Sequence, residues 1–195
     1  MVAVLSLALG IGANTTIFSA VDVFMLRPLP YDHASDLVQI WATSPERGWT
    51  RASVSPLDIQ DFRRESKTLD IAAYNARSFN LSGGDRPERL RSLRVMDNFF
   101  RVLRVSPAMG RTFLGEEEQP GHGHVVILSN GLWQRRFGAD PGILDRTIHL
   151  NGEPYTVVGV MPQDFRVVGE TVDLWTPLVF DGTEQRGRHY LRAVG

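Results

Sequence analysis

A nearly continuous apolar segment at the N-terminus restricts the fold of this chain more than any other feature. It runs from Val2 to Leu26 and reads VAVLSLALGIGANTTIFSAVDVFML. A helix needs roughly 20 apolar residues to cross the hydrocarbon core of a bilayer. The only charged residue in the segment is Asp22, near its end, where a charge costs less than at the bilayer centre. The segment therefore predicts a transmembrane helix within residues 1–28.

Two other interpretations of this segment fit the residues less well. A secretory signal peptide has a basic region before its apolar run and a small-x-small cleavage site after it, and both are missing here. A buried helix of a soluble core would be unusually long and apolar. Gly10-Ile11-Gly12 has the first two glycines of a dinucleotide-binding fingerprint, but Thr15 replaces the third and no strand precedes them.

The composition of the whole chain excludes several classes of function. The 195 residues are 43% hydrophobic and 22% charged, which permits a packed core and argues against global disorder. A net charge of −1 is not typical of a nucleic-acid-binding protein, so no nucleic acid is expected as a partner. Cysteine is absent, which excludes disulfides, thiolate catalysis and cysteine-based zinc sites.

The first half of the remaining chain mixes strand and helix signals, which predicts an α+β fold. Apolar and aromatic runs indicate the strands, and a serine followed by proline is typical of a helix N-terminus. The expected elements are a strand at Leu37–Thr43, a helix beginning at Ser55-Pro56, one bent strand or two strands within residues 69–81, a strand at Glu88–Met96, and a short helix over 98–105 that is capped by Asp97.

The second half continues the mixed pattern. Asn151-Gly152 between two apolar runs is a strong hairpin signal, although the gap of four residues predicts a loop longer than the minimal turn. The expected elements are a strand at Val125–Leu128, a helix capped by Ser129 that ends at Gly138, a turn at 140–142, strands at Thr147–Leu150, Tyr155–Met161 and Leu174–Leu178, and a last strand that opens within 189–195.

No group of residues forms a recognisable site for chemistry, so no catalytic, cofactor-binding or metal-binding residue is assigned and no enzyme activity is expected. His122 and His124 lie two apart on a glycine-rich loop without a third ligand nearby. The acidic run Glu116–Glu118 lacks the spacing of a calcium loop and is expected to be a solvated loop. The sequence contains neither a phosphate-binding Gly-x-x-x-x-Gly-Lys-Ser/Thr loop nor a Gly-x-Ser-x-Gly nucleophile motif.

Arginines and tryptophans are the remaining candidates for binding. Arg86, Arg89, Arg91 and Arg94 lie on or just before a predicted strand, whose alternating sides separate them onto two faces. A charged edge strand therefore explains them better than an anion site. Tryptophan residues in three predicted elements are expected to belong to the core or to contacts between subdomains, rather than to a ligand cage; they are Trp41, Trp133 and Trp175.

Several stretches together resemble ABC-transporter permeases of the MacB/FtsX-like family, of the duplicated type frequent in acidobacteria. The stretch LALGIGANTTIFSAVDVFMLRPLPY is similar to their first transmembrane helix and the segment that leaves it. Three later stretches resemble parts of the MacB-like periplasmic core domain; they read SFNLSGGDRPERLRSLRVMDNFFRVLRVSPAMGRTF, VVILSNGLWQRRFGADPGILDRTIHLNGEPYTVVGVMPQDF and HYLRAVG. The resemblance covers nearly the whole chain in the right order.

This resemblance implies a two-subdomain extracytoplasmic domain over residues 29–195, with an inserted subdomain at about 105–178 and a truncated C-terminus. It implies a permease that dimerises in the bacterial cell membrane, holds this domain in the periplasm and pairs with a cytoplasmic ABC ATPase. The expected function is to couple the ATPase to export or periplasmic movement of a substrate, without a cofactor. A membrane-anchored periplasmic ligand-binding module is the alternative.

Overall fold

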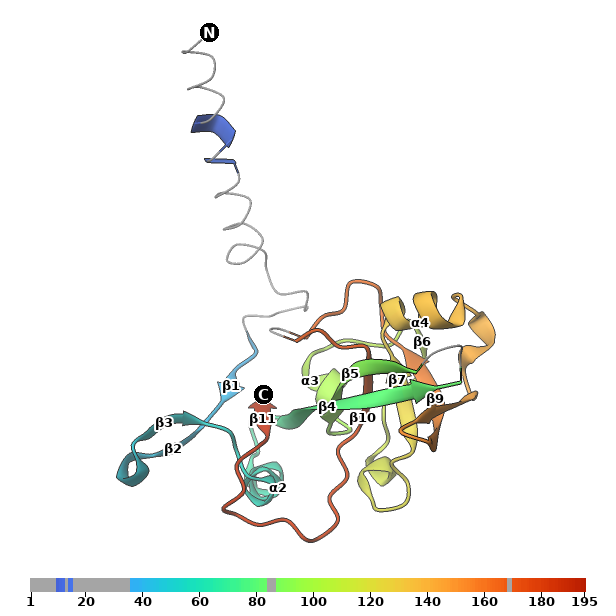
Figure 1. The fold of residues 1–195 in the computed structure, drawn as a ribbon. Helices are drawn as coiled ribbons and strands as arrows, with labels where there is room; N and C mark the ends of the chain where they lie inside the picture. Colours follow the sequence, from blue (N-terminus) through green and yellow to red (C-terminus); the bar gives the residue numbers. More distant parts are fainter. Residues whose placement is uncertain (1–9, 13, 16–35, 84–86, 168–169) are drawn as a thin grey trace.

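A mixed β-sheet is the framework of the domain (Figure 1). The computed structural model describes residues 10–12, 14–15, 36–83, 87–167 and 170–195. Within these segments, nine strands form one sheet, and β2 (Ala42–Ser44) and β3 (Trp49–Ala52) form a separate hairpin that projects from it. The strands of the main sheet are β1 (Gln39–Ile40), β4 (Ala72–Ser82), β5 (Glu88–Val95), β6 (Met109–Gly110), β7 (Val125–Leu128), β8 (Thr147–Leu150), β9 (Glu153–Val160), β10 (Leu174–Pro177) and β11 (Arg192–Val194).

The order of the strands brings distant parts of the sequence side by side. It runs β1-β11-β4-β5-β10-β7-β9-β6, and β8 pairs with both β4 and β9. The pairs β5–β10 and β7–β9 are parallel, and the others are antiparallel. The last strand, β11, therefore lies between β1 and β4 rather than next to β10, which precedes it in the sequence.

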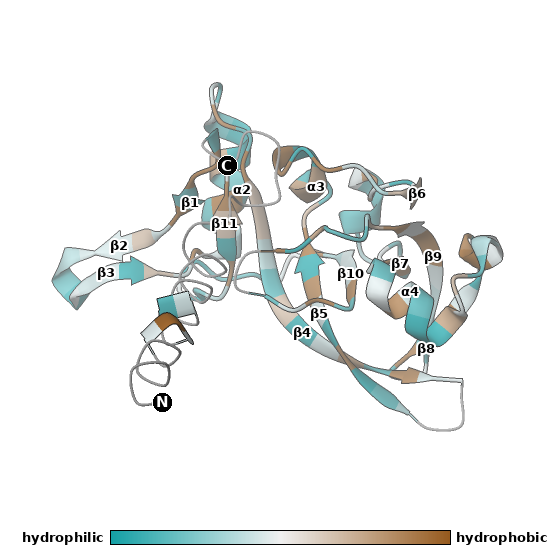
Figure 2. Ribbon diagram, turned by 90° about the horizontal axis from the view of Figure 1, so that it is seen from above, coloured by the Kyte–Doolittle hydropathy of each residue, from teal (hydrophilic) through white to brown (hydrophobic). Residues whose placement is uncertain are grey.

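The antiparallel pair of β4 and β5 crosses the domain and joins its two ends (Figure 2). Residues 69–81 were expected to form a bent strand or two strands, and the structure has one long strand, β4. The expected charged edge is wrong for Arg94, because β10 pairs with the second half of β5 in the register Leu174↔Ser92 to Pro177↔Val95. Arg89 and Arg91 lie in the first half of β5, which pairs with β4 as its one strand partner among the described residues.

Both expected serine caps are confirmed. In α2 (Pro56–Glu65), the Ser55 hydroxyl accepts a hydrogen bond from the Asp58 backbone N–H at 3.2 Å. In α4 (Asn130–Phe137), the Ser129 hydroxyl accepts one from the Leu132 N–H at 3.1 Å, and Gly138 ends the helix with φ of 61°. These bonds satisfy backbone donors that a helix leaves free at its first turn.

The expected cap at Asp97 is wrong. The short helix α3 (Phe99–Val102) begins after Asn98, whose side chain makes no capping hydrogen bond. The Asn98 amide instead donates to Asp70 Oδ1 at 2.7 Å and to the Ile71 carbonyl at 3.0 Å, while the Asp97 carboxylate pairs with Arg63. Short 3₁₀ helices also occur among the described residues, including η3 (Pro45–Arg47), η4 (Gly115–Glu118) and η5 (Pro141–Ile143).

Two strand boundaries also differ from the sequence-based expectation. The strand expected over Leu37–Thr43 is interrupted at Trp41, because β1 pairs with β11 whereas β2 pairs with β3. The hairpin between β8 and β9 has the minimal turn, Asn151-Gly152, since Glu153 already pairs with Leu150. Asn151 and Gly152 have φ of 53° and 86°, which is the conformation that an Asn-Gly hairpin favours.

Buried side chains form clusters on both faces of the sheet and around α2. The α3 face of the sheet holds Phe99, Phe100 and Trp175, the last only 1% exposed. Leu174, the preceding residue in β10, joins the opposite face, where Leu132 of α4 packs. The cluster around α2 contains, among others, Ile59, Met96, Leu178, Leu191 and Ala193.

The predicted transmembrane helix lies largely outside the described residues. Only Gly10–Gly12, Asn14 and Thr15 are described within it, and they are helical. Among the residues that the structure describes, we find no helix with the length and hydropathy needed to cross a bilayer.

Candidate functional site: paired ends and a charged joint

The first and last strands of the described chain are hydrogen-bonded to each other. The Val38 N–H donates to the Gly195 carbonyl at 2.8 Å, and the Gly195 N–H donates to the Val38 carbonyl at 3.0 Å. The ladder continues with Gln39 opposite Val194 and Ile40 opposite Ala193. Segments near the two ends of the described part of the chain therefore lie side by side, and we call them the paired ends (residues 38–40 and 193–195).

The paired ends are anchored in the rest of the domain. β11 pairs on its other side with β4, in the register Arg192↔Tyr74 to Val194↔Ala72. Leu191 exchanges backbone hydrogen bonds with Val54, just before α2, at 2.8 and 3.1 Å. A displacement of the paired ends would thus act directly on α2 and on β4.

Three charged side chains, Arg63, Asp97 and Glu118, form a second contact between distant segments, which we call the charged joint. Arg63 of α2 donates through Nη2 to Asp97 Oδ1 at 2.7 Å and through Nη1 to Glu118 Oε2 at 2.9 Å. The Asp97 backbone N–H donates to Glu118 Oε1 at 2.7 Å. One arginine fork therefore links α2, the end of β5 and η4.

The surroundings of the charged joint shift the pKa of Glu118. Burial, which disfavours the charged carboxylate, raises the pKa of Glu118 from its ordinary 4.5 to about 7, and repulsion from Asp97 acts in the same direction. The hydrogen bond from the Asp97 N–H and the Arg63 charge act against this rise in pKa. Glu118 thus changes charge near neutral pH.

The solvated loop expected at Glu116–Glu118 is wrong for two of its three residues. Glu117 is buried, and its carboxylate accepts hydrogen bonds from Nη2 and Nη1 of Arg111 at 2.7 and 3.1 Å. Its Oε2 also accepts a hydrogen bond from the Leu114 N–H at 2.8 Å. Glu118 belongs to the charged joint. Their partners lie outside the acidic run, and Arg63 is 55 residues away, so no local pattern indicates the contact.

The remaining sequence candidates have separate environments. His122 and His124 are both exposed, and the His124 ring lies against Tyr155 in a tilted arrangement with ring centroids 5.0 Å apart. Within the described segments, no three histidine or acidic side chains are arranged to hold a metal ion. The expectation for the tryptophans is confirmed for Trp175 and Trp133, which pack in the core clusters, but Trp41 is 39% exposed.

The comparisons with known proteins identify the family. The family model of the MacB-like periplasmic core domain matches residues 1–193. The chain belongs to this family. As a MacB-like domain it shares its fold with solved extracytoplasmic domains of transporters, and its mixed α/β architecture agrees with the α+β class expected from the sequence.

The relatives of this MacB-like domain include one curated protein and two solved domains. It is 28% identical over 102 residues to the "Probable syringafactin export ATP-binding/permease protein SyfD" of Pseudomonas syringae pv. tomato, a match that covers 51% of this chain and 15% of that protein. The extracellular domain of the ABC-type transporter YknZ from Gram-positive bacteria superposes with a TM-score of 0.59 and 16% identity, over 82% of both chains. The periplasmic region of MacB from Actinobacillus actinomycetemcomitans superposes with a TM-score of 0.57 and 16% identity, over 81% of this chain and 72% of that chain.

Proposed function

We propose that this domain is the extracytoplasmic part of an ABC-transporter permease and transmits movement from membrane helices to a substrate outside the cytoplasmic membrane. In this proposal residues 1–28 form the first membrane helix. The permease acts as a dimer with a cytoplasmic ABC ATPase, whose ATP binding and hydrolysis drive the movement. The transported substrate is not part of the proposal.

The pairing of β1 with β11 is the observation that carries this function. β1 follows the proposed membrane helix in the sequence, and its hydrogen bonds to β11 pass a shift of β1 on to the rest of the sheet. The sheet continues without interruption from β11 through β4 and β5 to β10. Tilting of the membrane helices would therefore be passed on as a rigid-body rotation of the domain.

The charged joint links the two subdomains that we propose. We propose the boundaries expected from the family resemblance, with residues 105–178 as the inserted subdomain. Glu118 then belongs to the inserted subdomain, and Arg63 and Asp97 belong to the core.

Labelling of a single cysteine tests the extracytoplasmic location. The chain has no native cysteine, so Ser82→Cys, on the exposed end of β4, is placed in the full-length permease after removal of any cysteines elsewhere. We expect a membrane-impermeant thiol reagent to label intact cells. Ala73→Cys, at a fully buried position of the same strand, is the matched control and should react only after denaturation.

The outcome of this labelling decides the location directly. Reaction of the Ser82 variant before lysis supports the proposal. Reaction only after lysis places the domain in the cytoplasm, and the coupling function is then wrong.

A further inference from the structure

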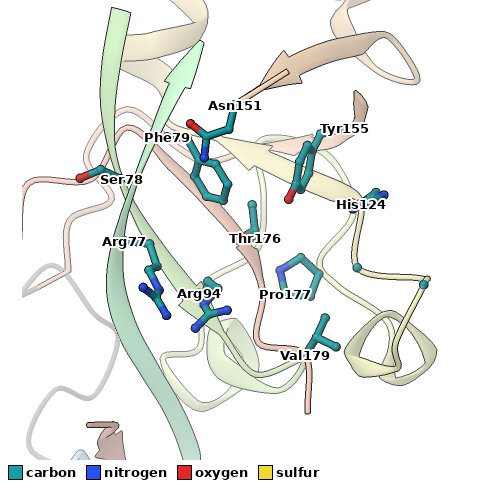
Figure 3. A pocket seen from close by; sticks show the side chains of 12 residues that line it. Arg77, Ser78, Phe79, Arg94, His124, Asn151, Tyr155, Thr176, Pro177 and Val179 are labelled. Carbon is teal, nitrogen blue, oxygen red and sulfur yellow. The ribbon is translucent and has the colours of Figure 1, made fainter. Parts of the chain in front are cut away.

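An open pocket of about 460 Å³ lies on the α4 face of the sheet, at the crossing of segments that are distant in the sequence (Figure 3). Its lining includes Arg77 and Phe79 from β4, Arg94 from β5, Thr176 from β10 and Tyr155 from β9. The volume lies within the range of about 300–1,000 Å³ that is usual for small-molecule sites.

Two arginines without a carboxylate partner form one wall of the pocket. Figure 3 shows Arg77 and Arg94 on the neighbouring strands β4 and β5, and both residues line the pocket. Arg94 donates through Nε to Asn75 Oδ1 at 3.3 Å, and among the described residues neither arginine forms an ion pair. Burial and then the nearby Arg77 charge lower the pKa of Arg94, so an anion here would relieve uncompensated positive charge.

An unpaired hydroxyl lies between the two walls. Thr176 is only 2% exposed, and its Oγ1 has no hydrogen-bond partner within the part of the chain that the structure describes. Because Thr176 pairs with Arg94 in the parallel register of β10 and β5, both side chains emerge on the same face of the sheet. Figure 3 shows Thr176 on β10, between Phe79 and Tyr155. A buried polar group of this kind indicates a missing partner.

Aromatic side chains form the opposite wall and its upper edge. The rings of Phe79 and Tyr155 make an edge contact with centroids 5.7 Å apart, and the His124 ring makes a tilted contact with Tyr155. The Tyr155 hydroxyl points into the pocket, and burial raises its pKa, so it keeps its proton and is a donor at neutral pH. The Glu153 carboxylate lies 3.6 Å from His124 Nε2.

We propose that this pocket binds a small organic anion, a carboxylate or phosphate group attached to an aromatic body. The anionic group lies between Arg77 and Arg94 and accepts from the Thr176 hydroxyl, because arginine forks match the geometry of both groups. The aromatic body packs against Phe79 and Tyr155. This site does not depend on the proposed coupling function.

Titration calorimetry of the 195-residue chain in mild detergent tests the site, with phenyl phosphate and benzoate as probes. Inorganic phosphate, which lacks the ring, and phenol, which lacks the charge, are the control ligands. We expect Arg77→Gln to weaken binding of phenyl phosphate roughly tenfold or more, as loss of a hydrogen bond from a charged group usually does. Thr176→Val should weaken it less, without lowering the melting temperature.

Arg89→Gln is the matched control, because Arg89 is an exposed arginine of β5 that lies one residue out of phase with Arg94 and thus on the other face of the sheet. It makes the same change in net charge and should leave the affinity unchanged. Melting temperatures of all variants establish that they are folded. Equal weakening by Arg77→Gln and Arg89→Gln, or absence of phenyl phosphate binding at millimolar concentration, overturns the proposal.

Discussion

Glu118 shows how the environment of a single carboxylate makes the stability of a domain depend on pH. Its pKa is about 7 in the folded protein and near the ordinary 4.5 in the unfolded chain. Between these values the folded state binds the proton more tightly, so protonation stabilises the fold. The stabilisation is complete below pH 4.5 and is lost as the pH rises through about 7.

We therefore predict that the free energy of unfolding falls between pH 5 and pH 8, by on the order of 1–3 kcal/mol from this group. Glu118→Gln, which cannot ionise, should remove most of this pH dependence. Urea unfolding of both proteins across the pH range measures it. Glu116→Gln, at the exposed neighbouring position, should keep the wild-type slope. An unchanged slope in Glu118→Gln would show that the charged joint does not control the pH dependence.

The environments of Arg94 and Glu118 could be predicted from the sequence only in part. Strand alternation correctly separated Arg94 from Arg89 and Arg91, because the period of two is a local property of a strand. The environments of Arg94 and Glu118 depend on residues 50 or more positions away, such as Thr176 and Arg63. No spacing within the sequence encodes those contacts. The sequence therefore predicted a charged edge strand at Arg94 and a solvated loop at Glu118.

Among the elements, the turn between β8 and β9 depends most directly on a single residue type. Gly152 has φ of 86°, in the left-handed region that residues with a Cβ atom disfavour. We predict that Gly152→Ala lowers the free energy of unfolding by about 1 kcal/mol or more. Chemical denaturation of the purified chain measures the change.

Gly131→Ala in α4 is the control, for which we expect the free energy of unfolding to change in the opposite direction. It is exposed, and a Cβ atom there would meet no heavy atom within 4 Å. Gly131→Ala should raise the free energy of unfolding by about 0.5–1 kcal/mol, since alanine favours the helix. If both variants shift stability in the same direction, the conformation of the Asn151-Gly152 turn does not explain the effect.

Elements with local signals were predicted well from the sequence, and those defined by distant partners were not. Ser55 and Ser129 bond to N–H groups three residues later, so the capping pattern suffices to locate α2 and α4. The strand around Trp41 was predicted as one element because its composition is uniform. Its division into β1 and β2 results from two different partners, β11 and β3, which composition does not encode.

On the scale of the whole molecule, the proposed coupling requires the paired ends to stay together while the domain moves. Gln39 and Val194 face each other next to the hydrogen-bonded pair Val38–Gly195, so they form a non-hydrogen-bonded pair. Cα atoms in such a pair are about 4.5 Å apart, which suits a disulfide. We predict that a Gln39→Cys/Val194→Cys disulfide in the full-length permease leaves ATP hydrolysis by the assembled transporter unchanged.

Comparison of the oxidised and reduced double variant measures this effect, and Gln39→Cys alone controls for the substitution. Activity that disappears on oxidation and returns on reduction would mean that β1 and β11 separate during the cycle. In that case the sheet does not move as one body from its paired ends.

The same pairing has a consequence for how such a domain is combined with other proteins. Val38 and Gly195 are opposite each other in a hydrogen-bonded pair, so their Cα atoms are only about 5.5 Å apart. A module with this geometry fits into a tight loop of a host without forcing apart the segments that flank it. Transplanting residues 38–195 into a surface hairpin of an unrelated protein should therefore leave the fold of the recipient intact.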